Sequence, residues 1–218
     1  PLFAQRIRQA VRKGCAVSAI NSVPIDSTYT TANAYLLNPS RWSKALAEVA
    51  AAVAVSKGID APVAASATDA AKNIAASMLS GECKAILLGN AAAHHAQASS
   101  LLALANWIGQ QTGASVGYLT EAGNTVGAQW AGAQPGENGL NAGQMLAGGL
   151  KAVILLNNEP EFDSAAGTKA KAALGQAQMV VSMNPFSANM DFCEVILPIS
   201  PFTETSGSFV NAEGRLQS

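Results

Sequence analysis

The sequence predicts an α/β fold with a doubly wound, mainly parallel sheet and helices on both of its faces. Short runs rich in β-branched residues alternate with longer stretches rich in Ala and Leu, which is the order of elements that builds a parallel sheet. Each short run is almost wholly apolar, as expected for a strand that is covered on both faces. A chain of 218 residues is also long enough to bury a core without disulfide or metal staples.

Six segments carry the strand pattern: 16–20, 85–88, 115–119, 152–156, 179–182 and 195–197. Two stretches interrupt the alternation, because 21–38 is rich in Ser, Thr, Asn and Tyr, and 121–139 is rich in Gly. We expect both to be long loops. Trp130 is the expected anchor of the second loop, since a large aromatic side chain in a stretch without periodicity usually fills a pocket.

Helices are predicted between the strands from apolar spacing and from capping residues. Ser40 can cap a helix that ends before Gly58, and Thr68 can cap a helix that stops at Gly81. The other predicted helices are one around Leu2, Ile7 and Val11, the longest one between Asn90 and Gly113, and segments 141–150 and 161–174. We interpret residues 1–201 as one α/β domain and residues 202–218 as the start of a truncated C-terminal extension.

Charge and composition exclude several classes of function. The 13 Lys and Arg residues against 14 Asp and Glu give a net charge of −1, so no global field favours nucleic acid. No apolar run reaches the about 20 residues that a membrane-spanning helix needs, so we expect no direct membrane insertion. Cys15, Cys83 and Cys193 are widely spaced in apolar surroundings, which predicts buried, reduced thiols rather than a disulfide framework or a cluster site.

One turn has the position of a phosphate site. Gly89 and Asn90 follow an apolar strand and open a helix, where backbone N–H groups and the helix dipole favour an anion. No complete nucleotide fingerprint accompanies them, so a purely structural turn is the alternative. His94 and His95 are adjacent and therefore point about 100° apart on a helix, which favours packed or exposed histidines over metal ligands.

The segment 193–217, CEVILPISPFTETSGSFVNAEGRLQ, carries the most specific pattern. An apolar strand ends at Pro198, a turn contains Glu204 and Gly207, and the segment closes as N-x-E-G-R-x-Q. This order resembles the late signature of the molybdopterin oxidoreductase family, with its A-D-V-V-L-P strand, E-x-x-G-T/S-F turn and N-x-E-G/R-R-V-Q close. Within that family, the variant L-P-x-x-P-F-T-E-T-S-G-x-F-V-N-x-E-G-R is similar to the family's representatives in bacterial NADH:quinone oxidoreductases, the respiratory complex I.

The resemblance implies a Rossmann-like domain of the formate dehydrogenase/DMSO reductase type, excised from a longer subunit. It implies a scaffold within the NADH-to-quinone electron-transfer complex, with no independent catalysis and no cofactor in this fragment. The iron–sulfur clusters of the parent subunit would lie upstream. The implied partners are the remainder of that subunit and other peripheral-arm subunits, on the cytoplasmic side of the bacterial inner membrane.

The alternative is a binding module that retains a molybdopterin guanine dinucleotide or another nucleotide. The candidate cofactor-binding residues are then Gly89, Asn90, Thr203, Asn211 and Arg215, because an Arg offers a bidentate fork for phosphate. In the scaffold interpretation, Arg215 instead pairs with Glu204 or Glu213. We predict no catalytic residue and no metal ligand.

Overall fold

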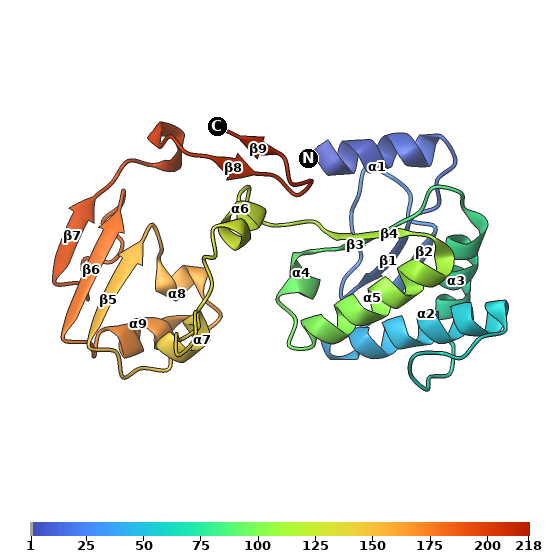
Figure 1. Cartoon of the computed structure of the whole chain (residues 1–218), viewed down its shortest axis with the longest axis horizontal. Helices are drawn as coiled ribbons and strands as arrows, with labels where there is room; N and C mark the ends of the chain where they lie inside the picture. Colours follow the sequence, from blue (N-terminus) through green and yellow to red (C-terminus); the bar gives the residue numbers. More distant parts are fainter. Residues whose placement is uncertain (1) are drawn as a thin grey trace. The chain divides into compact units, whose positions relative to one another are not determined.

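The computed structural model describes residues 2–218 and divides the chain into two compact units, Pro1–Glu121 and Ala122–Ser218 (Figure 1). The division lies at the start of the Gly-rich stretch 121–139. The start of a C-terminal extension at residue 202 stays a prediction. Within residues 2–218, no helix is long and apolar enough to cross a membrane.

The first unit alternates helices and parallel strands. Its elements are α1 (Leu2–Arg12), β1 (Ser18–Asn21), β2 (Asn33–Leu36), the short 3-10 helix η1 (Pro39–Arg41), α2 (Trp42–Lys57), α3 (Asp69–Ser80), β3 (Ala85–Leu88), α4 (Asn90–Ala93), α5 (Ala98–Thr112) and β4 (Ser115–Tyr118). β1 pairs with β2 and β3 pairs with β4, both in parallel. These two pairs are separate sheets within the described residues.

Helix α2 is the centre of the core in this unit. Ala45, Ala50 and Val53 are fully buried, and α2 packs against both α3 and α5. The Ala side chains of α2 are small, so α3 and α5 can pack close to its backbone. A helix that is apolar all round is expected to be buried in this way. Gly58 ends α2 in the left-handed conformation, as the sequence predicted.

One charged side chain lies inside this core. Glu48 of α2 is 4% exposed, and its Oε2 accepts hydrogen bonds from Tyr35 Oη at 2.6 Å and from Thr68 Oγ1 at 3.1 Å. Thr68 also caps α3, because its hydroxyl accepts from the backbone N–H of Ala71. The carboxylate therefore ties β2, α2 and the start of α3 together, and its two donors compensate for its burial.

Three local predictions in this unit are corrected by the structure. The polar stretch 21–38 contains β2, whose inward positions are held by polar or amphipathic residues, Asn33 and Tyr35, so that the apolar alternation is hidden. Asn38, not Ser40, provides the cap, since its side chain accepts from the Ser40 N–H and starts η1. The predicted helix from Asn90 to Gly113 is broken between α4 and α5, where the N–H of Gln97 donates to Nδ1 of His95.

The second unit contains a three-stranded parallel sheet. Its elements are α6 (Thr125–Trp130), α7 (Ala142–Met145), β5 (Ala152–Leu156), α8 (Pro160–Asp163), α9 (Thr168–Leu174), β6 (Met179–Asn184), β7 (Val195–Pro198), the 3-10 helix η2 (Phe202–Glu204), β8 (Phe209–Val210) and β9 (Leu216–Gln217). The order is β5-β6-β7, and α8 and α9 lie on one side of the sheet in Figure 1. β8 and β9 form a separate antiparallel hairpin.

Two predictions about burial are wrong. Trp130 ends α6 with 66% of its surface exposed, and its ring lies near Gly214 in the β8–β9 turn instead of filling a pocket. The cysteines are free thiols, as predicted, but Cys15 and Cys83 are exposed and Cys193 is half-buried.

The α/β class is confirmed, and all six predicted strands occur with ends shifted by two residues or fewer. The single continuous doubly wound sheet is not formed within residues 2–218. One physical reason is visible in the first unit, where β1 and β3 remain apart across a cavity that both strands line. The other is that β5, β6 and β7 belong to a second unit with its own sheet.

Candidate functional site at the carboxyl ends of the first-unit strands

The carboxyl ends of the strands in the first unit carry its main group of polar side chains. In open parallel sheets, ligands bind outside these ends, where the loops leave the sheet. Gly89 and Asn90 follow β3, Glu121 follows β4 by a short loop, and Ser22 follows β1. The structure therefore places the predicted residues Gly89 and Asn90 at the expected edge.

Asn90 is held by a carboxylate at this edge. Its Nδ2 donates to Oε2 of Glu121 at 2.7 Å, and Nε2 of His94 lies 3.8 Å from the same oxygen. His94 and Glu121 are both exposed. Gly89 has an ordinary extended conformation, and a Cβ added there would meet no atom within 4 Å, so no close approach requires a glycine. The polar contact of this turn is thus the hydrogen bond from the Asn90 side chain to Glu121.

His95 has a structural role beside this group. Its Nε2 lies 3.0 Å from the carbonyl oxygen of Pro39, and its ring stacks on Trp42 with centroids 5.7 Å apart and planes at 28°. Ser22, Pro39, Trp42 and the two histidines line one shallow hollow. The predicted packed role is confirmed for His95, and the predicted exposed role for His94.

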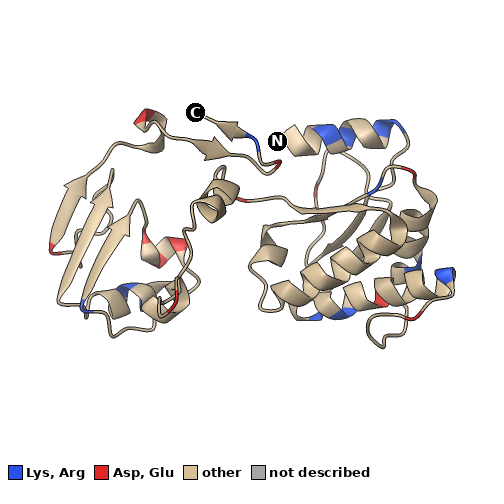
Figure 2. Ribbon diagram, in the orientation of Figure 1, with Lys and Arg blue, Asp and Glu red and all other residues tan. Residues whose placement is uncertain are grey.

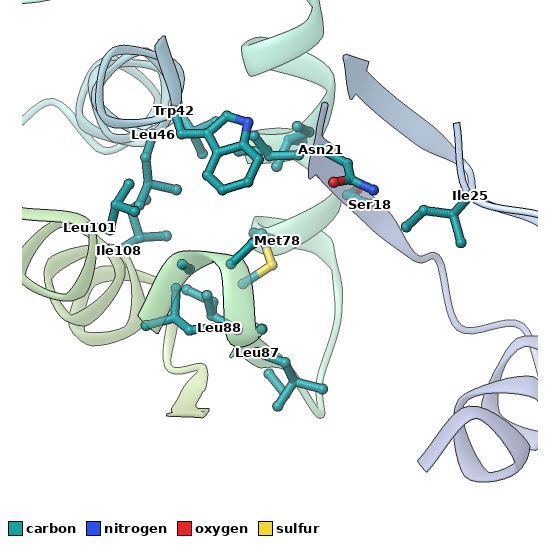
Figure 3. A pocket seen from close by; sticks show the side chains of 18 residues that line it. Ser18, Asn21, Ile25, Trp42, Leu46, Met78, Leu87, Leu88, Leu101 and Ile108 are labelled. Carbon is teal, nitrogen blue, oxygen red and sulfur yellow. The ribbon is translucent and has the colours of Figure 1, made fainter. Parts of the chain in front are cut away.

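An apolar cavity of about 360 Å³ lies beneath the same edge. Figure 3 shows side chains of α2, α3 and α5 in it, among them Trp42, Met78 and Ile108, together with Ser18 and Asn21 from β1. Ala91 and Ala92 of α4 also line it. Trp42 is only 8% exposed, and its buried indole N–H has no hydrogen-bond partner among residues 2–218. A buried donor without an acceptor is uncommon in native structures.

The other three candidate residues lie in the second unit. Oδ1 of Asn211 accepts from the N–H groups of Glu213 and Arg215, at 3.0 and 2.9 Å, so this side chain shapes the β8–β9 turn. Thr203 is exposed in η2, and the Arg215 side chain is exposed. Within residues 2–218, Arg215 forms no ion pair with Glu204 or Glu213, so the expected pair is not formed. Asn211 and Arg215 meet in this turn, where the Asn211 N–H also donates to the Arg215 carbonyl oxygen at 3.1 Å, whereas no hydrogen bond or ion pair among residues 2–218 links Thr203 to either of them.

The sequence model of the molybdopterin oxidoreductase family matches residues 1–218. The chain belongs to the molybdopterin oxidoreductase family. No curated protein matches it. This confirms the family that the segment 193–217 indicated, and with it an origin among oxidoreductases.

Membership in the molybdopterin oxidoreductase family raises the question of whether the carboxyl edge fits the pyrophosphate of a pterin dinucleotide. No Lys or Arg is among the described residues that line the cavity or the hollow. Figure 2 shows a group of basic residues on α1 and others along α2. Glu121 occupies the position beside Asn90 and would repel phosphate, and α4 has only four residues. The residues of this edge therefore do not fit a pyrophosphate.

Sequence reasoning missed Glu121 and Trp42 as members of this region. Glu121 stands at the beginning of a Gly-rich stretch, although its position directly after a strand is a usable signal. Trp42 stands on an apolar helix, and nothing in the sequence distinguishes a packed indole from one whose N–H has no partner. Within residues 2–218, no three His, Cys, Asp or Glu side chains form a group that could hold a metal ion.

Proposed function

We propose that this chain is a scaffold domain of a bacterial NADH:quinone oxidoreductase, within the subunit of that complex that resembles molybdopterin oxidoreductases. The choice of this complex rests on the segment 193–217. The scaffold role rests on one observation, an exposed apolar face on the sheet of the second unit. The domain would contact the remainder of its subunit and other peripheral-arm subunits on the cytoplasmic side of the inner membrane, and NADH oxidation would occur elsewhere in the complex.

The exposed face consists of two cross-strand rows. Ile154, Val181 and Val195 are in register, and so are Leu156, Met183 and Leu197 on the same side of the sheet. Ile154 is 72% exposed and Leu156 is 65% exposed. The opposite side holds the fully buried Val180 and Ser182. Since parallel sheets are covered on both faces in stable proteins, this face is expected to contact another polypeptide.

Hydrogen bonds that two candidate cofactor-binding residues already form within the chain support the same proposal. Asn90 is engaged by Glu121, and Asn211 is engaged by two backbone N–H groups of its own turn. A side chain that already satisfies the chain's own groups gives up a hydrogen bond before it can bind a ligand. These contacts favour a structural role over the retained-dinucleotide alternative.

The test replaces Ile154 with Glu in the intact parent subunit. A carboxylate at the centre of a contact that excludes water should reduce incorporation of the subunit into the complex more than about tenfold. Native gel electrophoresis measures incorporation, and NADH oxidation by membranes measures the assembled enzyme. The matched control is Val55→Glu, which changes an exposed Val at the end of α2 and should assemble normally.

Normal assembly of the Ile154→Glu variant would contradict the scaffold role of this face. Elemental analysis and mass spectrometry of the freshly purified subunit provide a separate check. Molybdenum and a pterin dinucleotide in a one-to-one ratio with the chain would support the binding-module alternative and reject the proposal.

A further inference from the structure

The β8–β9 hairpin is a small sheet of its own within the second unit. Each of its strands has two residues, and neither strand pairs with the sheet β5-β6-β7. A hairpin of two strands is marginally stable in water, because it needs further strands or a packed helix to hold it. Its packed neighbour is α6, which contacts β8 (Figure 1), and Val210 of β8 is only 5% exposed.

The side chain of Asn124 joins this hairpin to the start of α6. Its Oδ1 accepts a hydrogen bond from the Val210 N–H at 2.8 Å, and its Nδ2 donates to the Ser208 carbonyl oxygen at 3.2 Å. Both partners are backbone groups that flank Phe209 of β8. Within residues 2–218, no other hydrogen bond links segment 206–218 to the rest of the chain.

The contact has the pattern of strand pairing. In a parallel sheet, a residue accepts from the N–H that follows the facing residue and donates to the C=O that precedes it. The amide of Asn124 makes the same two bonds around Phe209, so it takes the place of one residue of a third strand. It thereby satisfies backbone groups on an edge that would otherwise stay unpaired.

The surroundings of Asn124 direct its side chain to the hairpin. Asn124 stands directly before α6, where an Asn usually caps its own helix, yet its side chain makes no capping bond. Gly127 of α6 leaves room for it, because a Cβ added to Gly127 would overlap Oδ1 of Asn124. At the other end of α6, Cζ2 of Trp130 lies 3.7 Å from where a Cβ of Gly214 would stand, in the β8–β9 turn. Both ends of α6 therefore contact the hairpin.

We propose that the amide of Asn124 is a latch, and that the hairpin opens and closes on it as one unit while the sheet β5-β6-β7 stays folded. A segment with few hydrogen bonds to its surroundings opens at a lower free energy than the core does. The closed latch fixes the turn that carries Asn211, Glu213 and Arg215, so it determines where this charged turn is presented. The latch needs the Asn side chain and the absence of a side chain at Gly127.

The test releases the latch in two independent ways in the full chain. Asn124→Ala deletes the amide without removing a helix cap, because the native side chain caps nothing. Gly127→Ala keeps the amide but displaces it. The matched control is Asn141→Ala, which deletes an Asn side chain that caps α7 in the same unit.

The readout is residue-resolved hydrogen exchange of three amides. The Val210 N–H donates to the latch itself. The Asn211 N–H donates to the Arg215 carbonyl oxygen and reports on the hairpin without touching the latch. The Asn157 N–H donates to the Met183 carbonyl oxygen and reports on the sheet.

In both variants the Val210 and Asn211 amides should exchange about tenfold or more faster than in the Asn141→Ala control, since the hairpin loses both of its hydrogen bonds to α6. The Asn157 amide should keep its rate. In an Asn124→Ala background, Gly127→Ala should cause no further acceleration, because the atom that it displaces is then absent.

Three results would overturn the proposal. Faster exchange of Val210 alone would show that the hairpin does not open as a unit. Equal acceleration of Asn157 would show that the whole second unit opens instead. Unchanged rates in either single variant, or a further acceleration in the double variant, would show that Asn124 and Gly127 do not act together as the latch.

Discussion

Replacing Tyr35 with Phe removes one donor from a buried carboxylate and leaves no cavity. In the native chain, the Tyr35 hydroxyl donates to Glu48 at 2.6 Å, and the Thr68 hydroxyl donates to the same oxygen. The Tyr35→Phe variant keeps the ring in place and keeps the Thr68 bond. The perturbation therefore removes the short hydrogen bond to the charged group, together with a longer one of 3.3 Å from the Thr68 hydroxyl to the Tyr35 oxygen.

The expected loss of stability follows from the nature of that bond. A hydrogen bond to a charged group contributes about 1.5–3 kcal/mol, because its loss leaves a buried charge less well satisfied. With a urea m-value of about 2 kcal/mol per molar, the unfolding midpoint of the first unit should fall by about 1 M. The m-value itself should not change, since neither the native nor the unfolded surface is altered.

The difference in unfolding midpoint between the native chain and the Tyr35→Phe variant should also depend on pH. The hydrogen bond to Glu48 is the main cause that raises the pKa of Tyr35 above its ordinary value of about 10. At high pH the unfolded chain therefore loses this proton before the folded chain does. The stabilisation is fully present below about pH 10 and is lost as the pH rises through the folded pKa, so the two midpoints should converge there.

Fluorescence can follow the first unit alone in a Trp130→Phe background, which leaves Trp42 and Trp107 as reporters. Trp130 is exposed, so its replacement should not disturb the core. Tyr118→Phe is the matched control, because Tyr118 is half-buried and its hydroxyl forms no hydrogen bond within residues 2–218. A Tyr35→Phe midpoint equal to that of the control would refute the role of this bond in stability.

Two further outcomes are expected from single sites. A Cβ at Gly109 would lie 2.5 Å from the Val116 side chain, so Gly109→Ala should lower the free energy of unfolding by about 1–3 kcal/mol. The control is Gly117→Ala, where an added Cβ meets no atom within 4 Å and the free energy should change less. Equal urea midpoints for the two variants would contradict the clash. Burial, and after it the nearby carboxylates, raise the pKa of the Cys193 thiol. Cys193 should therefore react with iodoacetamide at mildly alkaline pH more slowly than the exposed Cys83 does. Equal reaction rates measured by mass spectrometry would contradict this.

The strands were predictable because their signal is local. A run such as Ala152–Leu156 is apolar, β-branched and bounded by polar residues, and it forms β5 with the predicted bounds. β2 was not predictable in this way, since Tyr35 faces inward to reach Glu48 and so replaces an aliphatic residue with an amphipathic one. A tertiary hydrogen bond determines the residue type there, and no local pattern records it.

The candidate site was predictable only in its position. Gly89 and Asn90 lie at the carboxyl edge because the strand-to-helix order places them there. The contact of Asn90 with Glu121 joins residues that are 31 positions apart, and it depends on which strands are neighbours. The turn role of Asn211 is local, but an Asn in an N-x-E-G-R segment can serve equally as a turn former or as a ligand. Only the positions of the Glu213 and Arg215 N–H groups distinguish the two.

The mismatch between sequence pattern and burial is itself informative about neighbours. A strand that is apolar at consecutive positions predicts cover on both faces, and Ile154 to Leu156 follows that pattern. In the structure, however, Leu155 is half-buried while Ile154 and Leu156 are largely exposed. In the isolated chain these two side chains face water, so a polar substitution there removes few contacts and should leave the free energy of unfolding nearly unchanged. The Ile154→Glu variant of the isolated chain should therefore keep its free energy of unfolding within about 0.5 kcal/mol of the native value, while the same variant fails in assembly. A large loss of stability in the isolated chain would show that the face is already covered, and the case for an external partner would end.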